Sequence, residues 1–233
     1  MLKLGLPSKG RLQEQAVETL AAVGVTVGLA GREYAATAAG IEGVEPVLIA
    51  AGEAPRALAE GDVHLAVTGE DLILERVADP RRVRVLKRLG FGHADLVVAV
   101  PAAWVDVETL HDLDEAAAAF RLRHGRPMRV ATKYHRLARR FFAEAGVADY
   151  RLVDSQGATE AGPKNLTAEL IVDITSSGET LRANHLKPLA DGLILASEAV
   201  LAVSRAAEWS SVARLALNDL GARMGFNAAD AGL

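Results

Sequence analysis

The chain reads Ile171-Val172-Asp173-Ile174-Thr175-Ser176-Ser177-Gly178-Glu179-Thr180-Leu181 where an apolar strand passes through a loop of small residues into a helix. Such a loop can turn several backbone N–H groups and hydroxyls toward one point, and a helix N-terminus adds roughly half a positive charge there. Only small side chains let the backbone approach a phosphate closely. The pattern therefore suits a phosphate monoester, although an ordinary strand–turn–helix with a hydroxyl cap has the same residues.

This loop supplies the first candidates for a binding site. Asp173, at the end of the strand, can accept hydrogen bonds from the hydroxyls of a ribose. The candidate substrate-binding residues of the loop are Asp173, Thr175, Ser176, Ser177, Gly178 and Thr180. The chain has neither the GxxxxGKS/T pattern of nucleoside triphosphatases nor a GxGxxG motif after a strand, so the loop belongs to neither of those types.

Strand and helix signals alternate on both sides of the loop. Strands are expected at 2–6, 47–51, 63–67, 95–100, 128–131, 169–174 and 193–203, and helices at 11–23, 55–60, 108–124, 135–145, 179–185 and about 210–224. This alternation predicts an α/β fold with largely parallel sheets. Gly90-Phe91-Gly92 is the best candidate for a crossing between two lobes, and Lys187-Pro188 for the return. The predicted lobes are 1–90 with 188–233, and 91–187, which carries the loop.

Two further loops follow predicted strands and carry charged residues. Lys9 and Arg11 lie in the turn Pro7-Ser8-Lys9-Gly10-Arg11-Leu12, where they can face a bound anion because ligands of α/β folds sit at the carboxyl ends of strands. Exposed cations at a helix start are also common, although they oppose the helix dipole. In Thr68-Gly69-Glu70-Asp71 the carboxylates can hold magnesium or a hydroxyl, or can cap the next helix.

Composition excludes several classes of protein. The chain has 233 residues, no cysteine, a net charge of −4 and only 4% aromatic residues. Disulfides, thiolate chemistry and zinc held by sulfur are therefore excluded, and binding of nucleic acid is not expected. No apolar run approaches the roughly 18 residues of a membrane span, and the N-terminus lacks the pattern of a signal peptide. We expect a cytoplasmic protein that does not bind membranes.

Five segments together resemble the ATP phosphoribosyltransferase family. They are LGLPSKGRL, AVTGEDLILE, LGFGHADLVVAVP, RVATKYHRLARRFF and IVDITSSGETLRANHL, in the family's order and spacing from Leu4 to Leu186. One such loop would be weak evidence, but five in order are strong. The resemblance implies a two-lobed fold like that of type II periplasmic binding proteins, each lobe a mostly parallel sheet flanked by helices, with the active site in the cleft.

The resemblance also implies roles for particular residues. Residues 173–180 would hold the 5-phosphate and ribose of phosphoribosyl pyrophosphate. Lys9, Arg11 and Asp71 would be catalytic, facing the pyrophosphate, magnesium and the nucleotide from the other lobe. Gly69 and Glu160 complete the implied substrate-binding set. The Mg²⁺ ion is expected to arrive with the pyrophosphate, and no residue is implied as its ligand.

The chain departs from the family pattern at two places. Members often carry an arginine just after the strand at 47–51, where this chain has Ala50-Ala51-Gly52. An anion contact made there must be absent or supplied elsewhere, for example by Arg32 or Arg56. A Gly-Leu-Ala-Asp pattern usually precedes the phosphate loop, and here it reads Leu166-Thr167-Ala168-Glu169, with a longer acid.

The implied reaction joins N1 of the adenine of ATP to the ribose of phosphoribosyl pyrophosphate, at the first step of histidine biosynthesis. N1 has a free lone pair at neutral pH, so the attack needs no strong base, and a site without a catalytic histidine or cysteine is expected. The chain ends one helix after its last predicted strand, as in the short form of the family. That form works as a hetero-oligomer with a regulatory subunit resembling histidyl-tRNA synthetase.

Two other functions remain open on the sequence. One is a non-catalytic two-lobed binding protein for a phosphorylated or anionic small ligand, although most such proteins need a signal peptide. The other is a phosphoribosyltransferase that acts on a different base.

Overall fold

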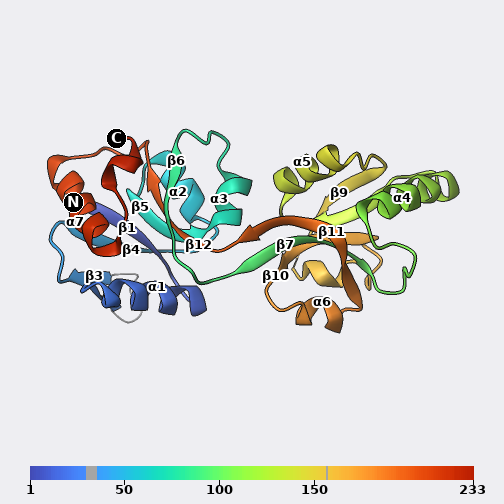
Figure 1. The fold of residues 1–233 in the computed structure, drawn as a ribbon, viewed down its shortest axis with the longest axis horizontal. Helices are drawn as coiled ribbons and strands as arrows, with labels where there is room; N and C mark the ends of the chain where they lie inside the picture. Colours follow the sequence, from blue (N-terminus) through green and yellow to red (C-terminus); the bar gives the residue numbers. More distant parts are fainter. Residues whose placement is uncertain (30–35, 156) are drawn as a thin grey trace. The chain divides into compact units, whose positions relative to one another are not determined.

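The computed structural model describes residues 1–29, 36–155 and 157–233 of the chain. They form two compact units, drawn in Figure 1. Unit 1 comprises Met1–Gly92 and Glu198–Leu233, and unit 2 comprises His93–Ser197. Arg32, one of the arginines considered above, lies outside the described residues.

Unit 1 is a five-stranded sheet with helices on both faces. Its strand order is β4-β1-β5-β12-β6, and a separate hairpin is formed by β2 and β3. The strands are β1 (Leu2–Pro7), β2 (Thr26–Leu29), β3 (Ala36–Ala39), β4 (Val44–Ile49), β5 (Leu65–Gly69), β6 (Val83–Arg88) and β12 (Ala199–Ser204). The helices are α1 (Arg11–Ala22), α2 (Ala54–Glu60), α3 (Glu70–Arg76), α7 (Ser211–Met224) and the short η2 (Ala228–Ala231).

The alternation of side chains along the strands of unit 1 divides its core in two. Leu65 and Leu201 point to the face covered by α1 and α7, where Leu20 and Leu220 are buried. Their neighbours Ala66, Val200 and Ala202 point to the other face, which packs against α2 and α3. Because successive strand residues face opposite sides, one apolar run supplies both cores.

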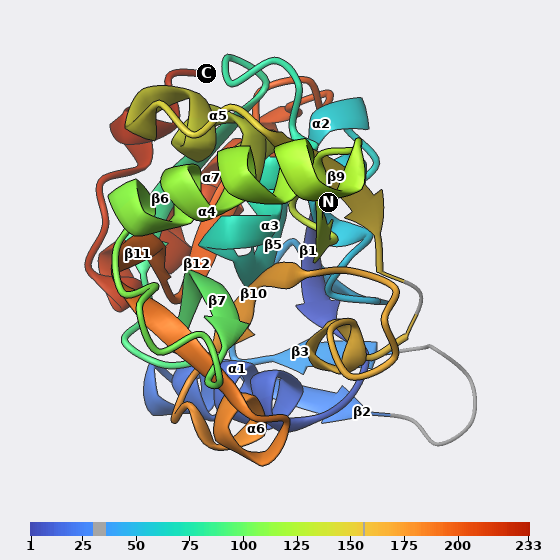
Figure 2. The ribbon, with the colours of Figure 1, turned by 90° about the vertical axis from the view of Figure 1, so that its right-hand side faces the viewer.

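Unit 2 is a second five-stranded sheet, in the order β11-β7-β10-β8-β9. Its strands are β7 (Ala94–Pro101), β8 (Met128–Thr132), β9 (Tyr150–Asp154), β10 (Leu170–Thr175) and β11 (Leu186–Ser197). Its helices are α4 (Leu110–His124), α5 (His135–Ala145), α6 (Glu179–Ala183) and η1 (Thr159–Ala161). Helices α4 and α5 lie on one side of this sheet and α6 on the other (Figures 1 and 2).

The local sequence explains where the helices of unit 2 begin and end. Thr109 and Asp112 form a reciprocal capping box at the start of α4, and Gly125 ends the helix in the left-handed conformation. In α5, Leu137 and Phe142 are buried against the sheet, and Gly146 ends the helix in the same way as Gly125. Each of these signals was visible in the sequence, so both helices fall close to their predicted positions.

Both sheets are mixed, which corrects the expectation of mostly parallel sheets. Among the described residues, each sheet has two parallel and two antiparallel strand pairings. The antiparallel strands are those at the crossings. The chain leaves unit 1 through β6 and returns through β12, and it enters unit 2 through β7 and leaves through β11. Strands that carry the chain in opposite directions and lie side by side must pair antiparallel.

The return to unit 1 occurs ten residues later than the predicted boundary at 187–188, between Ser197 and Glu198. Strand β11 pairs with β7 from Leu186 to Ser197, so residues 188–197 complete the sheet of unit 2. The first crossing falls after Gly92, at the end of the glycine pair considered above.

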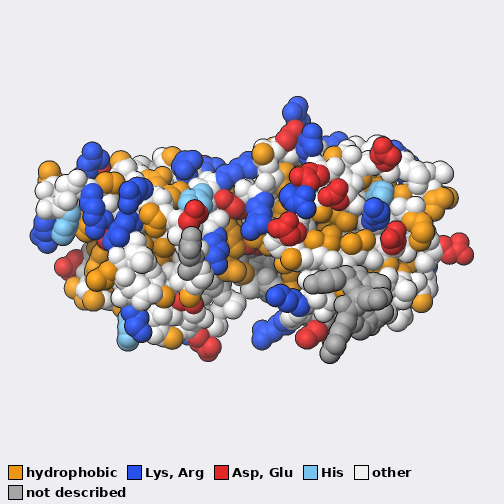
Figure 3. Space-filling model, turned by 180° about the vertical axis from the view of Figure 1, so that it is seen from behind, with side chains coloured by type: hydrophobic (Ala, Val, Ile, Leu, Met, Phe, Trp, Pro, Cys, Tyr) orange, Lys and Arg blue, Asp and Glu red, His pale blue; other side chains and the backbone are white. Residues whose placement is uncertain are grey.

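On the face drawn in Figure 3, acidic and basic side chains are interspersed with apolar ones on both units. No helix in the described part of the chain is both long enough and apolar enough to span a bilayer.

Candidate active site

The loop after β10 is held in shape by its own hydroxyl groups. The N–H of Gly178 donates to Oγ1 of Thr175 (3.0 Å), and the N–H of Glu179 donates to Oγ of Ser177 (3.3 Å). Gly178 has a φ of +73°, and a Cβ at this position would lie 2.9 Å from the guanidinium of Arg182. The positive φ therefore favours glycine here, whereas the flexible side chain of Arg182 could move aside.

The predicted loop residues surround one hollow of about 220 Å³. Thr175, Ser176, Ser177 and Thr180 line it, together with His93, which the sequence did not single out. The backbone N–H groups of Ser176 and Ser177 make no hydrogen bond to any other described residue. Free N–H groups beside several hydroxyls are the donors that an anionic oxygen takes.

Helix α6 is shorter than predicted and contributes less to this site than the sequence argument assumed. It has five residues and ends at Ala183, two residues before the predicted end. Because the helix macrodipole is a sum over aligned peptide units, one short turn supplies only a small part of it. An anion at this loop would therefore have to be held by the N–H groups and hydroxyls themselves.

Asp173 lies half-buried at the end of β10. Burial raises the pKa of its carboxyl above the ordinary value, and the nearby charge of Glu160 raises it further. Hydrogen bonds from the N–H of Ile174 (2.9 Å) and the hydroxyl of Thr159, with the charge of Lys133, act in the opposite direction. The structure thus brings Asp173 and Glu160 close enough to interact, as the two predicted acids of this unit.

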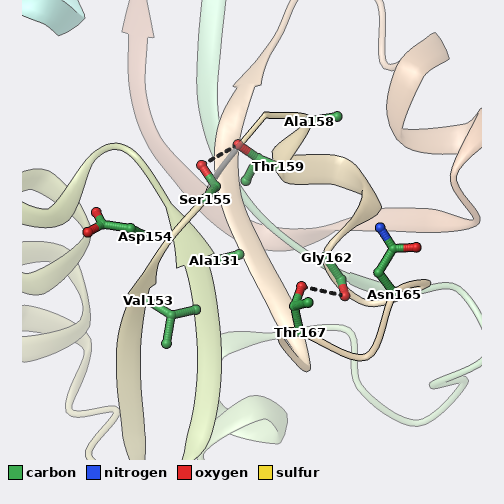
Figure 4. Close-up of a pocket in the computed structure, with 9 residues that line it drawn as sticks. All are labelled: Ala131, Val153, Asp154, Ser155, Ala158, Thr159, Gly162, Asn165 and Thr167. Atoms are coloured by element: carbon green, nitrogen blue, oxygen red, sulfur yellow. Dashed lines mark hydrogen bonds between the residues drawn. The ribbon is translucent and has the colours of Figure 1, made fainter.

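A second hollow, of about 250 Å³, adjoins this part of unit 2 (Figure 4). Ser155 and Thr159 lie on its wall and share a hydrogen bond of 2.8 Å. Thr167 donates to the carbonyl oxygen of Gly162 (3.2 Å), and Asn165 lies beside them in Figure 4. Thr159 also bonds to Asp173, so one wall residue of this hollow contacts a predicted site residue. These polar residues follow a strand, which is the one signal that could have found them.

Glu169, the lengthened acid before the loop, is part of a structural network. Its carboxylate accepts from the guanidinium groups of Arg126 (3.0 Å) and Arg129 (2.8 Å) and from the N–H of Arg129 (2.6 Å). Burial raises the pKa of Glu169, but the hydrogen bonds of Arg129 and Arg126 outweigh that effect and lower it to about 2. The acid therefore joins the starts of β8 and β10 and does not point to a substrate.

In unit 1, the cations of the first turn are available to a ligand. Lys9 and Arg11 are exposed, and neither makes an ion pair or a hydrogen bond through its side chain to any other described residue. The turn follows β1, which runs parallel to β4 and β5. The turns after these three strands consequently lie at one edge of the sheet, the edge at which α/β folds bind ligands.

The turn after β5 places Asp71 in a tight position. Asp71 is only 6% exposed, and its Oδ1 lies so close to Gly69 that a Cβ there would collide with it. Gly69 is thus required for packing. The neighbouring Glu70 pairs with Arg88 (2.6 Å), which also pairs with Glu198 (3.2 Å), so Glu70 is tied to residues that stand close to the two crossings in the chain.

The turn after β4, where the family arginine is missing, is occupied by Arg76. Its Nη1 donates to the carbonyl oxygen of Gly52 (2.6 Å), and the side chain is otherwise exposed. Arg56, the alternative suggested by the sequence, pairs instead with Glu53 (3.2 Å) and Glu60 (2.5 Å) on its own helix. A cation at this turn therefore comes from α3.

Comparison with known proteins gives a consistent result. A family model described as ATP phosphoribosyltransferase matches residues 50–224. The ATP phosphoribosyltransferase of Cereibacter sphaeroides is 59% identical over 96% of both chains. That of Mesorhizobium japonicum is 51% identical over 89% of this chain and 91% of its own length.

Solved structures agree on the fold. The ATP phosphoribosyl transferase (HisG:HisZ) complex from Thermotoga maritima contains a chain with a TM-score of 0.71 and 22% identity, matched over 97% of this chain and 96% of that one. An ancestral arginine-binding protein bound to arginine follows at a TM-score of 0.53 and 12% identity, over 96% of this chain and 90% of its own. The fold is that of two-lobed binding proteins, as predicted.

Proposed function

The chain belongs to the ATP phosphoribosyltransferase family, and from this premise we propose which role each of its site residues has in the reaction. It transfers the phosphoribosyl group of phosphoribosyl pyrophosphate to N1 of ATP, which gives phosphoribosyl-ATP and pyrophosphate. This is the first step of histidine biosynthesis.

The loop of unit 2 binds the 5-phosphate of phosphoribosyl pyrophosphate. The observation that carries this assignment is the hollow in which two unpartnered backbone N–H groups, of Ser176 and Ser177, meet the hydroxyls of Thr175 and Thr180. Asp173, next to the loop, accepts hydrogen bonds from the ribose hydroxyls. Holding both groups fixes the orientation of ribose C1, the atom that is attacked.

Unit 1 supplies positive charges that stabilise the leaving group, and it also contacts the nucleotide. Lys9 and Arg11 are unpaired cations and neutralise the pyrophosphate as it departs. Asp71 and Gly69 contact the nucleotide from the turn after β5. Glu160, near Asp173, joins the substrate-binding set of unit 2.

No residue of the chain has to remove a proton for the bond to form. The lone pair of adenine N1 attacks ribose C1 while the bond from C1 to the pyrophosphate oxygen breaks. The residues named above orient the two substrates and stabilise negative charge on the departing group. Orientation and electrostatic stabilisation are therefore the two sources of catalysis.

We assign Mg²⁺ to the pyrophosphate of the substrate. The described residues contain no group of three or more metal-binding side chains. Mg²⁺ typically uses one or two carboxylates, several waters and substrate phosphates, so an ion carried by the pyrophosphate needs no such group. When bound, the ion would neutralise charge on the pyrophosphate.

The partner is proposed to be a regulatory subunit that resembles histidyl-tRNA synthetase. Support comes from the fold match, over nearly the full length of both chains, to a chain of the HisG:HisZ complex from Thermotoga maritima. The chain also spans 96% of its relative from Cereibacter sphaeroides. We place the hetero-oligomer in the cytoplasm, where both phosphorylated substrates are made.

The test is to incubate the purified chain and the regulatory subunit with Mg²⁺, ATP and phosphoribosyl pyrophosphate, and to measure phosphoribosyl-ATP. Product that depends on all the components supports the assignment. Tight binding of phosphoribosyl pyrophosphate without product would favour a non-catalytic binding protein. Product with another base, but not with ATP, would indicate a different phosphoribosyltransferase.

A further inference from the structure

Lys133 follows strand β8 and lies beside Asp173. Strands β8 and β10 run parallel, with Thr132 opposite Val172. Continuing this register by one residue sets Lys133 opposite Asp173, on strands that lie about 4.8 Å apart. The charge of Lys133 acts on the carboxyl of Asp173, which agrees with this placement. Lys133 therefore belongs to the edge of the sheet that carries the phosphate loop.

The ammonium group of Lys133 is only partly engaged within the chain. Its Nζ donates to the carbonyl oxygen of Gly157 (3.1 Å), and the residue is exposed. Lys133 makes no ion pair with any residue that the structure describes. An ammonium group has three N–H donors, so Lys133 can hold Gly157 and still offer two donors to a ligand.

The acids around Lys133 leave its charge available. On one side of β8, Asp154 at the end of β9 is paired with His135 (2.6 Å). On the other side, Asp173 and Glu160 are close enough to interact, and both would repel an anion that approaches them. Lys133 supplies a positive charge at this place, which offsets part of that repulsion.

The order of the strands gives the direction in which a substrate extends from the phosphate loop. Strand β10 lies between β7 and β8. His93 and Ala94, at the start of β7, line the hollow of the loop, so this hollow lies on the β7 side of β10. Asp173 belongs to β10 itself, and Lys133 follows β8 on the far side. These three places lie in a row along one edge of the sheet.

The row matches the chemical order of groups in phosphoribosyl pyrophosphate. This molecule carries one phosphate on C5 and the pyrophosphate on C1, at opposite ends of the ribose. With the 5-phosphate in the loop and the ribose hydroxyls on Asp173, the substituent on C1 extends toward Lys133. A hydrogen bond from an ammonium group to a phosphate oxygen is roughly twice as strong as a neutral one.

We propose that Lys133 binds the pyrophosphate group of phosphoribosyl pyrophosphate from the side of unit 2. The inference rests on the proposed function, in which Lys9 and Arg11 of unit 1 act on the same group. It adds a contact from the unit that also holds the 5-phosphate, so that one unit binds both ends of this substrate.

The experiment compares phosphoribosyl pyrophosphate with ribose 5-phosphate, which lacks the pyrophosphate. Calorimetry measures the Kd of each for the full chain at one concentration of Mg²⁺. Lys133→Met should raise the Kd of phosphoribosyl pyrophosphate by about tenfold or more and change that of ribose 5-phosphate by less than about twofold. Lys133→Arg keeps the charge and should recover most of the lost affinity. Because Lys133 is exposed, both variants should melt close to the temperature of the wild type.

Lys187→Met is the matched control. Lys187 pairs with Val100, near the last residue of β7, whereas the phosphate loop lies beside the first residues of that strand. The control therefore removes a lysine from the same sheet at the opposite end of its strands. It should leave the Kd of both ligands unchanged.

Each other outcome overturns a distinct claim. An equal loss of both ligands in Lys133→Met would mean that Lys133 acts by holding the loop at Gly157 and does not bind the pyrophosphate. Unchanged affinity for both would show that Lys133 does not touch the substrate, while the assignment of the phosphate loop stands. If the wild type binds phosphoribosyl pyrophosphate but not ribose 5-phosphate, the assignment of the loop fails and the inference with it. If the wild type binds neither ligand, the proposed function itself is wrong.

Discussion

At the scale of single residues, Gly178 controls the shape of the phosphate loop. Its φ of +73° belongs to the left-handed region, and Arg182 occupies the space where a side chain would project. Its N–H closes the turn onto Thr175. A change here should alter phosphate binding more than stability, because the residue touches few core atoms.

We expect Gly178→Val to raise the Kd of phosphoribosyl pyrophosphate at least tenfold. A hydrogen bond to a charged acceptor contributes about 1.5–3 kcal/mol, and the variant would misplace more than one donor. Calorimetric titration of the Mg²⁺ complex of the substrate measures the effect. The matched control is Gly125→Val, since Gly125 also has a positive φ (+68°) but lies at the end of α4. Equal affinities in the two variants would contradict the assignment of the loop.

At the scale of elements, the candidate site residues follow the carboxyl ends of strands, whereas the ion pairs of Glu169 lie at the beginnings of strands. The turn between β1 and α1 presents Lys9 and Arg11 without partners, at a helix start that disfavours cations. At the start of β8, by contrast, Arg126 and Arg129 are fully engaged with Glu169. Similar residue types therefore serve different purposes according to the partners that the fold gives them.

Arg11→Ala should lower kcat/KM at least tenfold, equivalent to about 1.4 kcal/mol, with little change in melting temperature. The reason is that Arg11 has no intramolecular contact to lose, while the departing pyrophosphate loses a neutralising charge. Arg214→Ala, at another exposed arginine of unit 1, is the control and should have normal kinetics. Normal kinetics in Arg11→Ala, with a lower melting temperature, would mean that Arg11 is structural.

Glu169 should make the stability of the chain depend on pH in the acid range. Its pKa is about 2 in the folded chain and 4.5 in the reference state, so its stabilisation is complete above pH 4.5 and is lost as pH falls toward 2. The shift corresponds to on the order of 3 kcal/mol at neutral pH. Glu169→Gln should therefore unfold at a lower temperature at pH 7, and the gap from the wild type should shrink below pH 4.5. The exposed Glu144→Gln should show no such gap, and a constant gap at all pH values would refute the role of the carboxylate.

The sequence predicts elements best where both faces of a strand are buried. Of the interior strands, β1, β5, β7, β8 and β10 were each located to within two residues, whereas β12 was merged with the edge strand β11 into one predicted strand at 193–203. The edge strands β6 and β9 were missed, because an edge strand can carry cations such as Arg84 and Lys87 that break the apolar pattern. The sequence could indicate that residues of the loop at 173–180 lie together, because they are contiguous, and four of them line one hollow. It could not indicate the link from Thr159 to Asp173, because that link joins residues far apart in the sequence.

At the scale of the whole molecule, the chain passes twice between its two units, and the proposed site residues are divided between them. Arg88 and the N–H of Gly90 both bond to Glu198, so the outgoing and returning segments are fastened together on the side of unit 1.

We expect the chain alone to show little or no turnover, and the regulatory subunit to restore it and to confer inhibition by histidine. Assays of the isolated chain over a range of concentrations, followed by addition of the subunit and then of histidine, test this. Dilution that does not change specific activity is the control against self-association. Full activity of the chain alone, inhibited by histidine without a second protein, would contradict the hetero-oligomer.

The strand order of unit 1 also has a consequence for folding of the chain during its synthesis on the ribosome. Strand β12 lies between β5 and β6, yet it is made after all of unit 2. The first 92 residues consequently emerge with a gap in their sheet, and they must wait for more than a hundred further residues before it can close. Unit 2, whose strands are contiguous in the chain, is complete as soon as Ser197 leaves the exit tunnel. We therefore expect the usual order of folding during synthesis, in which the N-terminal domain folds first, to be reversed in this molecule.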